Sequence, residues 1–513
     1  MRDNVFKIHR LKAQRRLMTA IEEFDHQRPA NSRARRGETK DYVGAAFFWA
    51  LALGVALAPA ITFGSNRAVA WAFNGVYFAL LALLHEAWLL LSNRDRPIAL
   101  TQPLLRIPLI GAVIVIVWSM FQISPWAPEA WRHPIWSLAA EALSQNVQGY
   151  VSVNPDDGAY ALLRFLSCLF ALYLAMQLCA VKGRGRSFLY WLSFVGTLYA
   201  IYGLATVFSA NSATGFSELR ATFMNRNSYA TYAGLGFLCV LSVISDYFGS
   251  VASEDNFEHA LYRFVTLASS AGALWLFAFC VITSALLMTG SRGGISATLF
   301  AFLFFIALKM IRTRSSGQVS ASQTIMALIP FSILAAVIFF VLSINGGLFL
   351  TRIQSLSDEV RLAVYTLTSK SLFDAPLLGY GDGTFSSVLK MYRDATLPPP
   401  FFWDKAHNSY LEVFQGLGLI VGAALMVSFL SLFICVTSAA ISKVEGAALP
   451  LTASAACVLV GVHALVDFSM QIEAIALTWA ALVGAGLSRS LTISASNEAS
   501  EPRRRRRSSY SHY

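Results

Sequence analysis

His407, Asn408 and Glu412 are the residues whose types and spacing first suggest chemistry. They open a long apolar segment, directly after the longest polar interval between hydrophobic runs. Asn408 and Glu412 are four residues apart, so they share one face of a helix. An imidazole at the edge of a membrane can accept a proton near neutral pH. The alternative interpretation is that His407 is only a polar cap at the membrane interface.

Three arginines stand where the chain turns between apolar segments. Arg220 and Arg226 lie in one such connection, and Arg292 lies in the very short turn TGSRGG. A charge at the centre of a membrane helix costs about 2.5–3.5 kcal/mol, and less at a helix end. Either an acidic partner such as Asp467 or an anionic ligand must offset this cost, unless the arginines extend to water or form structural ion pairs.

An anion site is favoured because the arginines, His407 and Asp467 all fall at helix ends on the same predicted side. Arginine binds phosphate through two parallel hydrogen bonds. The glycines after Arg292 would let a phosphate approach the N–H groups of the next helix start. These residue types suit transfer from a phosphate-activated lipid, with arginine holding the phosphate and histidine deprotonating a hydroxyl.

Several other kinds of site are not indicated. The sequence has no DxD pair and no HExxH motif, so we expect neither a divalent metal nor another cofactor. It has no GxSxG nucleophile motif. The six cysteines fall inside apolar runs without a CxxC or Cys/His cluster, which is typical of core residues.

The composition shows which elements must position these side chains. The 513 residues are 56% hydrophobic and only 13% charged, whereas soluble proteins have about 25% charged residues. The apolar runs approach the roughly twenty residues of a membrane-spanning helix and are apolar on every face, which excludes barrel strands. We therefore predict an all-α polytopic membrane protein with about twelve helices, at 43–63, 68–91, 104–123, 160–180, 188–208, 228–247, 265–288, 294–311, 324–345, 408–439, 449–467 and 472–489.

The basic loops predict the orientation. Positive charge collects at 92–97, 182–186, 309–314 and around Lys443, and both termini are basic. Because cytoplasmic loops are rich in Lys and Arg, these loops should be cytoplasmic. Nucleic-acid binding is disfavoured, since neither terminus forms a folded basic module. Positive-inside topology and attraction to anionic membrane lipid are expected to account for the basic ends and the net charge of +11. The predicted divisions are 1–40 (basic segment), 41–345 (helices one to nine), 346–407 (periplasmic loop domain), 408–490 (helices ten to twelve) and 491–513 (basic tail).

The large loop at 346–407 should be a small extramembrane domain. We predict that Ser357 caps a helix that runs to about Phe373, and that the glycines of GYGDGTF then turn the chain. This pattern is not a dinucleotide fingerprint, because no strand precedes it. A second outside loop, 124–159, carries three tryptophans that suit an interfacial lid: Trp126, Trp131 and Trp136.

Four segments together resemble the O-antigen ligase and polymerase superfamily: LRATFMNRNSYATY (219–232), TGSRGG (289–294), PLLGYGDGTF (376–385) and HNSYLEVFQGLGLIVG (407–422). The resemblance covers roughly residues 200–430. It implies about twelve helices with one large periplasmic loop, and metal-independent glycan transfer from undecaprenyl diphosphate at the periplasmic face of the inner membrane. It also implies that Arg220 and Arg292 hold the diphosphate and that His407 is the base. Arg226, Asn408, Glu412 and Asp467 are expected to support them.

The resemblance leaves the acceptor open between the lipid A core, the growing glycan itself and a protein hydroxyl. Ligase and polymerase thus remain alternatives. A different class of function is a lipid-linked sugar flippase or another component of polysaccharide export. Transporters, however, place polar groups near the midplane and often contain repeats, whereas here the polar residues cluster at helix ends and no repeat is visible.

Overall fold

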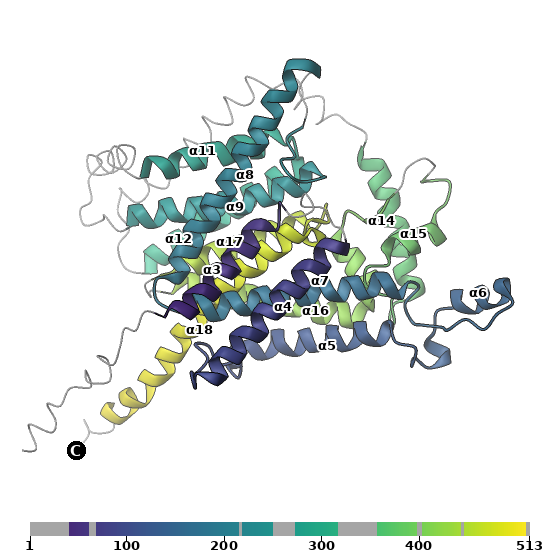
Figure 1. Cartoon of the computed structure of the whole chain (residues 1–513), viewed down its shortest axis with the longest axis horizontal. Helices are drawn as coiled ribbons and strands as arrows, with labels where there is room; N and C mark the ends of the chain where they lie inside the picture. The colour runs from purple at the N-terminus through teal and green to yellow at the C-terminus, as the bar shows by residue number, and fades with distance from the viewer. Residues whose placement is uncertain are drawn as a thin grey trace, which may run out of the picture. The chain divides into compact units, whose positions relative to one another are not determined.

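The computed structural model describes residues 41–60, 68–214, 218–249, 272–315, 357–397, 403–442 and 446–508. Every regular element in these ranges is helical, and they contain no strand. The prediction of an all-helical, multi-pass membrane protein is thereby confirmed. The packing described below concerns Phe48–Tyr513, which form one compact unit (Figure 1).

Eleven apolar helices form the body of the described chain. Eight are long and apolar enough to cross a membrane, and three are shorter. They correspond to eleven predicted spans; the predicted span 324–345 lies outside the described residues, so the count of twelve stays a prediction. The helices are α3 (Tyr42–Leu57), α4 (Ala68–Leu91), α5 (Arg106–Gln122), α7 (Pro155–Cys179), α8 (Arg184–Thr214), α9 (Arg226–Gly249), α11 (Gly272–Met288), α12 (Arg292–Ser315), α16 (Ser409–Ile441), α17 (Ala448–His463) and α18 (Glu473–Ser508).

Several boundaries differ from the prediction, among them the ends of α3 (Leu57 instead of 63), α8 (Thr214 instead of 208) and α17 (His463 instead of 467). The helix α7 begins at Pro155 instead of near residue 160, because Asn154 caps it: the Asn154 side chain accepts hydrogen bonds from the N–H groups of Asp156 and Asp157. Proline at the first helical position and two acids in the first turn complete this start signal. At the other end of the chain, α18 continues past residue 490 into the predicted basic tail.

The helix ends gather in two sets, as the loop alternation predicts. At one set, Lys309 Nζ donates a hydrogen bond to Ser245 Oγ at 2.6 Å. At the other set, which we call the His407 end, the N–H of Ser409 donates to the carbonyl of Ala464 at 2.9 Å. Lys309, from one of the predicted basic loops, and the helix start after His407 therefore lie at different ends of the helices.

This separation makes the orientation testable. We expect a reporter fused after Thr396, at the His407 end, to read periplasmic, and one fused after Thr313 to read cytoplasmic, because positive loops stay inside. Thr396 is exposed and Thr313 is partly exposed. Alkaline phosphatase and green fluorescent protein fusions at the two positions measure this. A cytoplasmic reading at Thr396 would contradict the proposed placement of the site.

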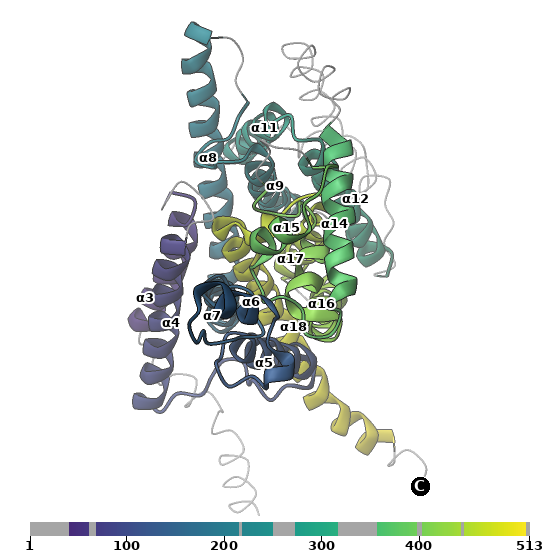
Figure 2. The same ribbon diagram turned by 90° about the vertical axis from the view of Figure 1, so that its right-hand side faces the viewer.

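The segment before α16 forms a small helical layer at the His407 end, made of α14 (Ser357–Asp374) and α15 (Phe385–Tyr392). Figure 2 shows these helices in front of the ends of α16 and α17. The predicted helix from Ser357 to about Phe373 is confirmed, while the capping side chain of Ser357 lies outside the described residues. The layer has its own apolar core of Val364, Leu367, Phe385, Leu389, Leu397 and Ala406.

The turn PLLGYGDGTF joins this layer to a break in α16. We expected one continuous helix over 408–439, but Gly418 is non-helical with φ +77°. The N–H of Leu419 instead donates to Pro376 O at 2.7 Å, and the N–H of Tyr380 donates to Gln415 O at 3.0 Å. The carbonyl and amide groups freed by the break are thus satisfied by the turn.

Glycine is required on both sides of this contact. A Cβ on Gly379, whose φ is +66°, would overlap the carbonyl oxygen of Gly416, and a Cβ on Gly418 would overlap that of Leu377. Backbone therefore lies directly on backbone here. This contact fixes the extramembrane layer to the helix whose first turn follows His407.

The loop between α5 and α7 packs on the same layer, with short helices η3 (Glu129–Trp131) and α6 (Ile135–Leu143). Trp136 Nε1 donates to Ser152 O at 3.0 Å, and the N–H of Val153 donates to Tyr380 O at 2.9 Å. Trp126, in contrast, is fully outward-facing, with 86% of its surface exposed. Whether these tryptophans meet a membrane interface stays a prediction.

Candidate active site

His407 occupies a backbone conformation that non-glycine residues rarely adopt. Its φ is +54°, in the left-handed region, immediately before the cap of α16. Such a conformation costs on the order of 1–3 kcal/mol and persists only where neighbouring contacts enforce it. Retained strain of this kind clusters at functional sites, so the turn is a first indication that the direction of the His407 side chain matters.

Two hydrogen bonds enforce the turn from its two sides. The hydroxyl of Tyr365, on α14, donates to the carbonyl of His407 at 2.8 Å. The N–H of Ala406 donates to Oε2 of Glu412 at 3.1 Å. Glu412 is buried, with 7% of its surface exposed. Glu412 therefore holds the backbone of the His407 turn, and Tyr365 does so from an element that sequence reasoning had not connected to His407.

Asn408 also contacts the backbone next to His407. Its side-chain oxygen accepts hydrogen bonds from the N–H groups of Tyr410 and Leu411, both at 3.1 Å. It is therefore the N-cap of α16, and capping contributes about 1 kcal/mol of stability. The predicted proximity of Asn408 and Glu412 is real, but both side chains point to the backbone around His407.

The imidazole of His407 faces the carboxylate of Asp467. His407 Nδ1 lies 3.5 Å from Asp467 Oδ1, and neither atom has a hydrogen-bond partner among the described residues. Asp467 is fully buried, whereas 17% of the His407 side chain is exposed. A carboxylate opposite Nδ1 orients the ring and favours a proton on Nδ1, which leaves Nε2 as the basic nitrogen.

Aromatic rings fix the plane of the imidazole. The ring centroid of His407 lies 5.0 Å from that of Trp403 and 4.8 Å from that of Phe468, both edge-to-face. Trp403 comes from the segment before the strained turn and Phe468 directly follows Asp467. Apolar faces on both sides limit rotation and exclude water from the ring.

Asp467 is held by a buried relay of three further side chains, Ser469, Thr231 and His463. Ser469 Oγ donates to Asp467 Oδ2, and Thr231 Oγ1 donates to Ser469 Oγ at 2.8 Å. Thr231 Oγ1 also lies 2.6 Å from His463 Nδ1. Thr231 Oγ1 also reaches the carbonyl of Asn227 at 3.2 Å. The relay therefore connects the Asp467 carboxylate to the buried His463 through two hydroxyl groups.

His407 and the relay groups together keep the Asp467 carboxyl ionised. Burial by itself raises the pKa of this carboxyl, but the facing His407 imidazole, together with the relay groups, outweighs burial and lowers the pKa below its ordinary value. Asp467 thus stays ionised beside His407. The Ser409 hydroxyl adds a hydrogen bond to the Asp467 carbonyl at 3.0 Å.

The arginines at this end have an acidic partner that sequence reasoning missed. Glu218 accepts an ion pair from Arg226 at 2.7 Å and another from Arg220 at 3.3 Å. More than half of the Arg220 side chain is exposed, and 30% of Arg226. Glu218, rather than Asp467, therefore compensates these two charges, and it keeps both guanidinium groups together at the start of α9.

Arg292 is the first residue of α12, next to the relay. A Cβ on Gly293 would lie 3.0 Å from Nε2 of His463, and one on Gly294 would lie 2.5 Å from Cβ of Ala230. Close helix packing is thus a sufficient reason for both glycines. The approach of a phosphate to this helix start stays a prediction, as do the roles of Arg292 and Arg220.

Comparison with known families agrees with the motifs. Residues 275–427 match the family model described as O-Antigen ligase, which confirms the resemblance to the O-antigen ligase and polymerase superfamily. The matched segment contains Arg292 and His407, while Arg220 and Asp467 lie outside it. No curated protein matches the chain.

Proposed function

We propose that this protein is a glycosyltransferase that moves a glycan from undecaprenyl diphosphate to an acceptor hydroxyl at the periplasmic face of the inner membrane. The O-antigen ligase match over residues 275–427 supports a ligase or polymerase role in general. The observation that carries the specific proposal is the strained, carboxylate-oriented His407, within that matched segment and at the same helix end as the arginines.

In the proposed reaction, Nε2 of His407 accepts the proton of the acceptor hydroxyl as its oxygen attacks the anomeric carbon of the donor. The bond between that carbon and the diphosphate oxygen breaks, and the electron pair leaves with the diphosphate. The buried Asp467 carboxylate stabilises the imidazolium that forms. The reaction therefore needs no reactant besides the donor and the acceptor.

Arg292 and Arg220 would stabilise the departing diphosphate. Developing charge is best stabilised by donors that are already in place, and guanidinium groups offer planar pairs of donors to phosphate oxygens. Arg226 supports Arg220 through the shared Glu218 carboxylate. A ligand with two negative charges could displace Glu218 from Arg220, whose contact is the longer of the two.

Purified protein should transfer glycan from a lipid-diphosphate donor to an added acceptor, and should do so in excess EDTA, since the proposed groups supply both the base and the charge stabilisation. Product formation is followed by gel shift of the acceptor. Loss of transfer in EDTA that magnesium or manganese restores would contradict this chemistry. Movement of the donor lipid across the vesicle membrane without glycan transfer would instead support the flippase alternative.

The Arg292→Lys variant tests the diphosphate assignment in the same assay, with Arg186→Lys as its matched control. Lysine keeps the charge but loses the planar fork, so transfer should fall strongly while the protein still accumulates in the membrane. Arg186→Lys, at the opposite helix end where Arg186 lies 3.5 Å from Asp246, should leave transfer unchanged.

A further inference from the structure

The outward face of α14 and the turn after it carry large apolar side chains that are exposed. Leu362, Phe373 and Leu377 are exposed over 65%, 73% and 59% of their surface. Leu362 and Phe373 are about three turns apart, so they lie on one face of the helix. The opposite face, with Val364 and Leu367, packs into the apolar core of the extramembrane layer. We call Leu362, Phe373 and Leu377 the apolar stripe.

The apolar stripe adjoins the outward side of α16. The N–H of Leu419 donates to the carbonyl of Pro376, and a Cβ on Gly418 would overlap the carbonyl oxygen of Leu377. Directly after this contact, Ile420 is 67% exposed. It begins a row of exposed apolar side chains along α16 that continues with Val427, Leu430 and Ile434. The stripe is therefore continuous with this row.

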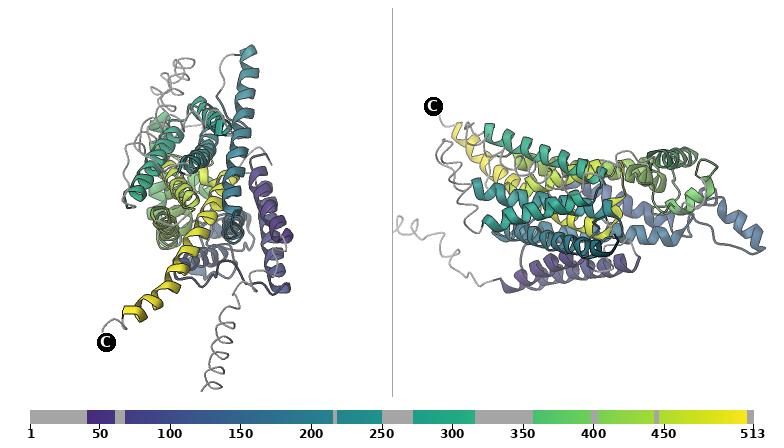
Figure 3. Two further views of the ribbon diagram at one scale, coloured as in Figure 1. Left: turned by 90° about the vertical axis from the view of Figure 1, so that its left-hand side faces the viewer. Right: turned by 90° about the horizontal axis from the view of Figure 1, so that it is seen from above.

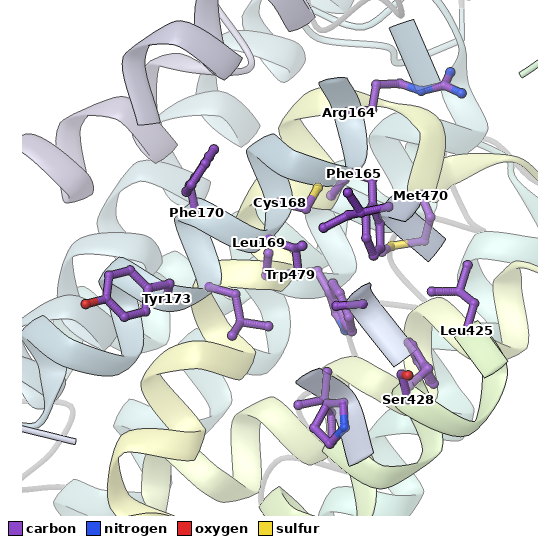
Figure 4. A pocket seen from close by; sticks show the side chains of 18 of the residues that line it. Arg164, Phe165, Cys168, Leu169, Phe170, Tyr173, Leu425, Ser428, Met470 and Trp479 are labelled. Atoms are coloured by element: carbon purple, nitrogen blue, oxygen red, sulfur yellow. The ribbon is translucent and has the colours of Figure 1, made fainter. Parts of the chain in front are cut away.

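The exposed row on α16 is a lipid-facing surface. The opposite side of α16 lines an apolar cavity of about 690 Å³ between α5, α7 and α18. Figure 4 shows Leu425 and Ser428, from α16, among the side chains that line this cavity. With about 3.6 residues per turn, Leu425 lies opposite to Val427 and Ile434. In a multi-pass membrane protein, an exposed apolar face of a spanning helix lies against the hydrocarbon.

The length of α16 places the apolar stripe at the boundary of the hydrocarbon core. From Leu419 to Ile441 the helix has about 23 residues, roughly 34 Å, whereas the hydrocarbon core is about 30 Å thick. This part of α16 can span the core by itself, so the break at Gly418 lies near the boundary at the His407 end. Trp118 lies at the same level, because its Nε1 donates to Leu417 O at 3.0 Å. Tryptophan is enriched at membrane–water interfaces.

The direction of α14 suits a position in the interface. Figures 1 and 2 show α14 crosswise to α5, α7 and α16, and Figure 3 gives the same helices from two other directions. A helix in the plane of the interface buries one apolar face about 5–10 Å into the boundary between headgroups and acyl chains. Lys370 and Asp374 on α14 are exposed and polar. The long lysine side chain can extend to the headgroups while the stripe is in the lipid.

We propose that the apolar stripe inserts into the lipid leaflet at the His407 end, which makes α14 an interfacial anchor of the extramembrane layer. Tyr365, whose hydroxyl donates to the carbonyl of His407, belongs to the same helix. The anchor therefore sets the height of the His407 turn above the hydrocarbon core. The contact with lipid is independent of the proposed function, whereas its consequence for transfer rests on that function, because the diphosphate of a lipid donor lies at the membrane surface.

The test attaches a nitroxide spin label to the full-length protein at Phe373→Cys or Leu377→Cys, in vesicles of phosphatidylethanolamine and phosphatidylglycerol. Power saturation measures collisions of the label with oxygen, which concentrates in lipid, and with a water-soluble nickel chelate. Thr396→Cys, exposed on the same layer, is the aqueous control, and Ile420→Cys is the lipid control. The wild type treated with the label gives the background from the native cysteines.

The ratio of oxygen to nickel collisions decides what covers the stripe. For Phe373→Cys and Leu377→Cys we expect a ratio roughly fivefold or more above that of Thr396→Cys, as for a side chain in the acyl boundary. A ratio equal to that of Thr396→Cys would overturn the inference, because the stripe would then face water. Few collisions with either agent would also overturn it, since a protein surface, such as a second copy of the chain, would then cover the stripe.

A second arm connects the anchor to transfer. The double substitution Phe373→Ser and Leu377→Ser should lower the collision ratio of a label at Leu362→Cys toward the aqueous value. Because a misplacement of about 1 Å can cost about 10²-fold in rate, transfer should fall by about tenfold or more. Leu138→Ser on α6, which is exposed but outside the stripe, is the matched control and should leave transfer unchanged.

The two arms separate the anchor from the proposed function. Unchanged transfer in the double variant, once its label has left the lipid, would overturn the role of the anchor in setting the height of His407. A lipid-inserted stripe in a wild-type protein that transfers no glycan would overturn the proposed function and support the anchor.

Discussion

His407→Gln should lower turnover by about 10²–10⁴-fold while donor binding stays close to that of the wild type. This range is what a positioned general base contributes. Glutamine keeps a polar side chain of similar reach but cannot take a proton from the acceptor hydroxyl. Donor binding should persist, because the diphosphate is assigned to the arginines. The measurement is transfer rate per folded protein, with donor affinity determined separately.

The comparison with His407→Ala separates catalysis from structure. If His407 acts as the base, alanine and glutamine should be equally inactive. If His407 is only a polar cap at the interface, glutamine should restore function, and any defect of alanine should appear as a lower protein level. Wild-type-like turnover in His407→Gln would end the general-base assignment.

Asp467→Asn should reduce turnover by up to about 10⁴-fold, the cost of the equivalent change in serine protease triads. An amide can turn its NH₂ group toward His407, which favours the wrong tautomer, and it cannot stabilise an imidazolium. The effect should lie in kcat rather than in donor affinity. The volume hardly changes at this fully buried position, so protein levels should remain high.

Ser469→Ala is the matched control for Asp467→Asn. It removes one hydrogen bond to the Asp467 carboxylate and breaks the relay to Thr231, but it leaves the negative charge opposite His407. We expect a smaller loss of turnover than for Asp467→Asn. Equal losses in both variants would mean that the relay, and not the carboxylate, is what the reaction needs.

The sequence predicted the helices well because membrane spans have a strong, local signal of length and apolarity. It predicted the glycine turn at 379–383 for a similar reason, since positive φ is a property of single residues. It did not predict the break at Gly418. That break depends on hydrogen bonds between the turn and α16, and such long-range backbone pairing leaves no periodic pattern in either segment.

The sequence identified several residues of the candidate site but not the contacts between them. His407 and Asp467 were both singled out by their position at helix ends, yet Asp467 was considered as a partner for arginine, a role that Glu218 fills for Arg220. Thr231 and His463 were not identified, because a hydroxyl or imidazole inside an apolar run looks the same whether it packs or relays.

The structure also changed the reasons given for two predicted residues. Asn408 and Glu412 were chosen because they share a helix face, and they do act together, but through the backbone of the His407 turn. The strain at His407 explains why so many contacts converge there. A cap, a buried glutamate and a tyrosine from α14 all hold one peptide segment in place.

The most direct test of the central claim, that His407 and Asp467 act as one catalytic unit, is the transfer rate of four purified proteins: the wild type, His407→Gln, Asp467→Asn and the double variant. Residues that act as a unit have strongly non-additive effects. The double variant should therefore transfer glycan about as slowly as His407→Gln alone. A double variant whose loss equals the product of the two single losses would contradict the claim, because each residue would then act independently of the other.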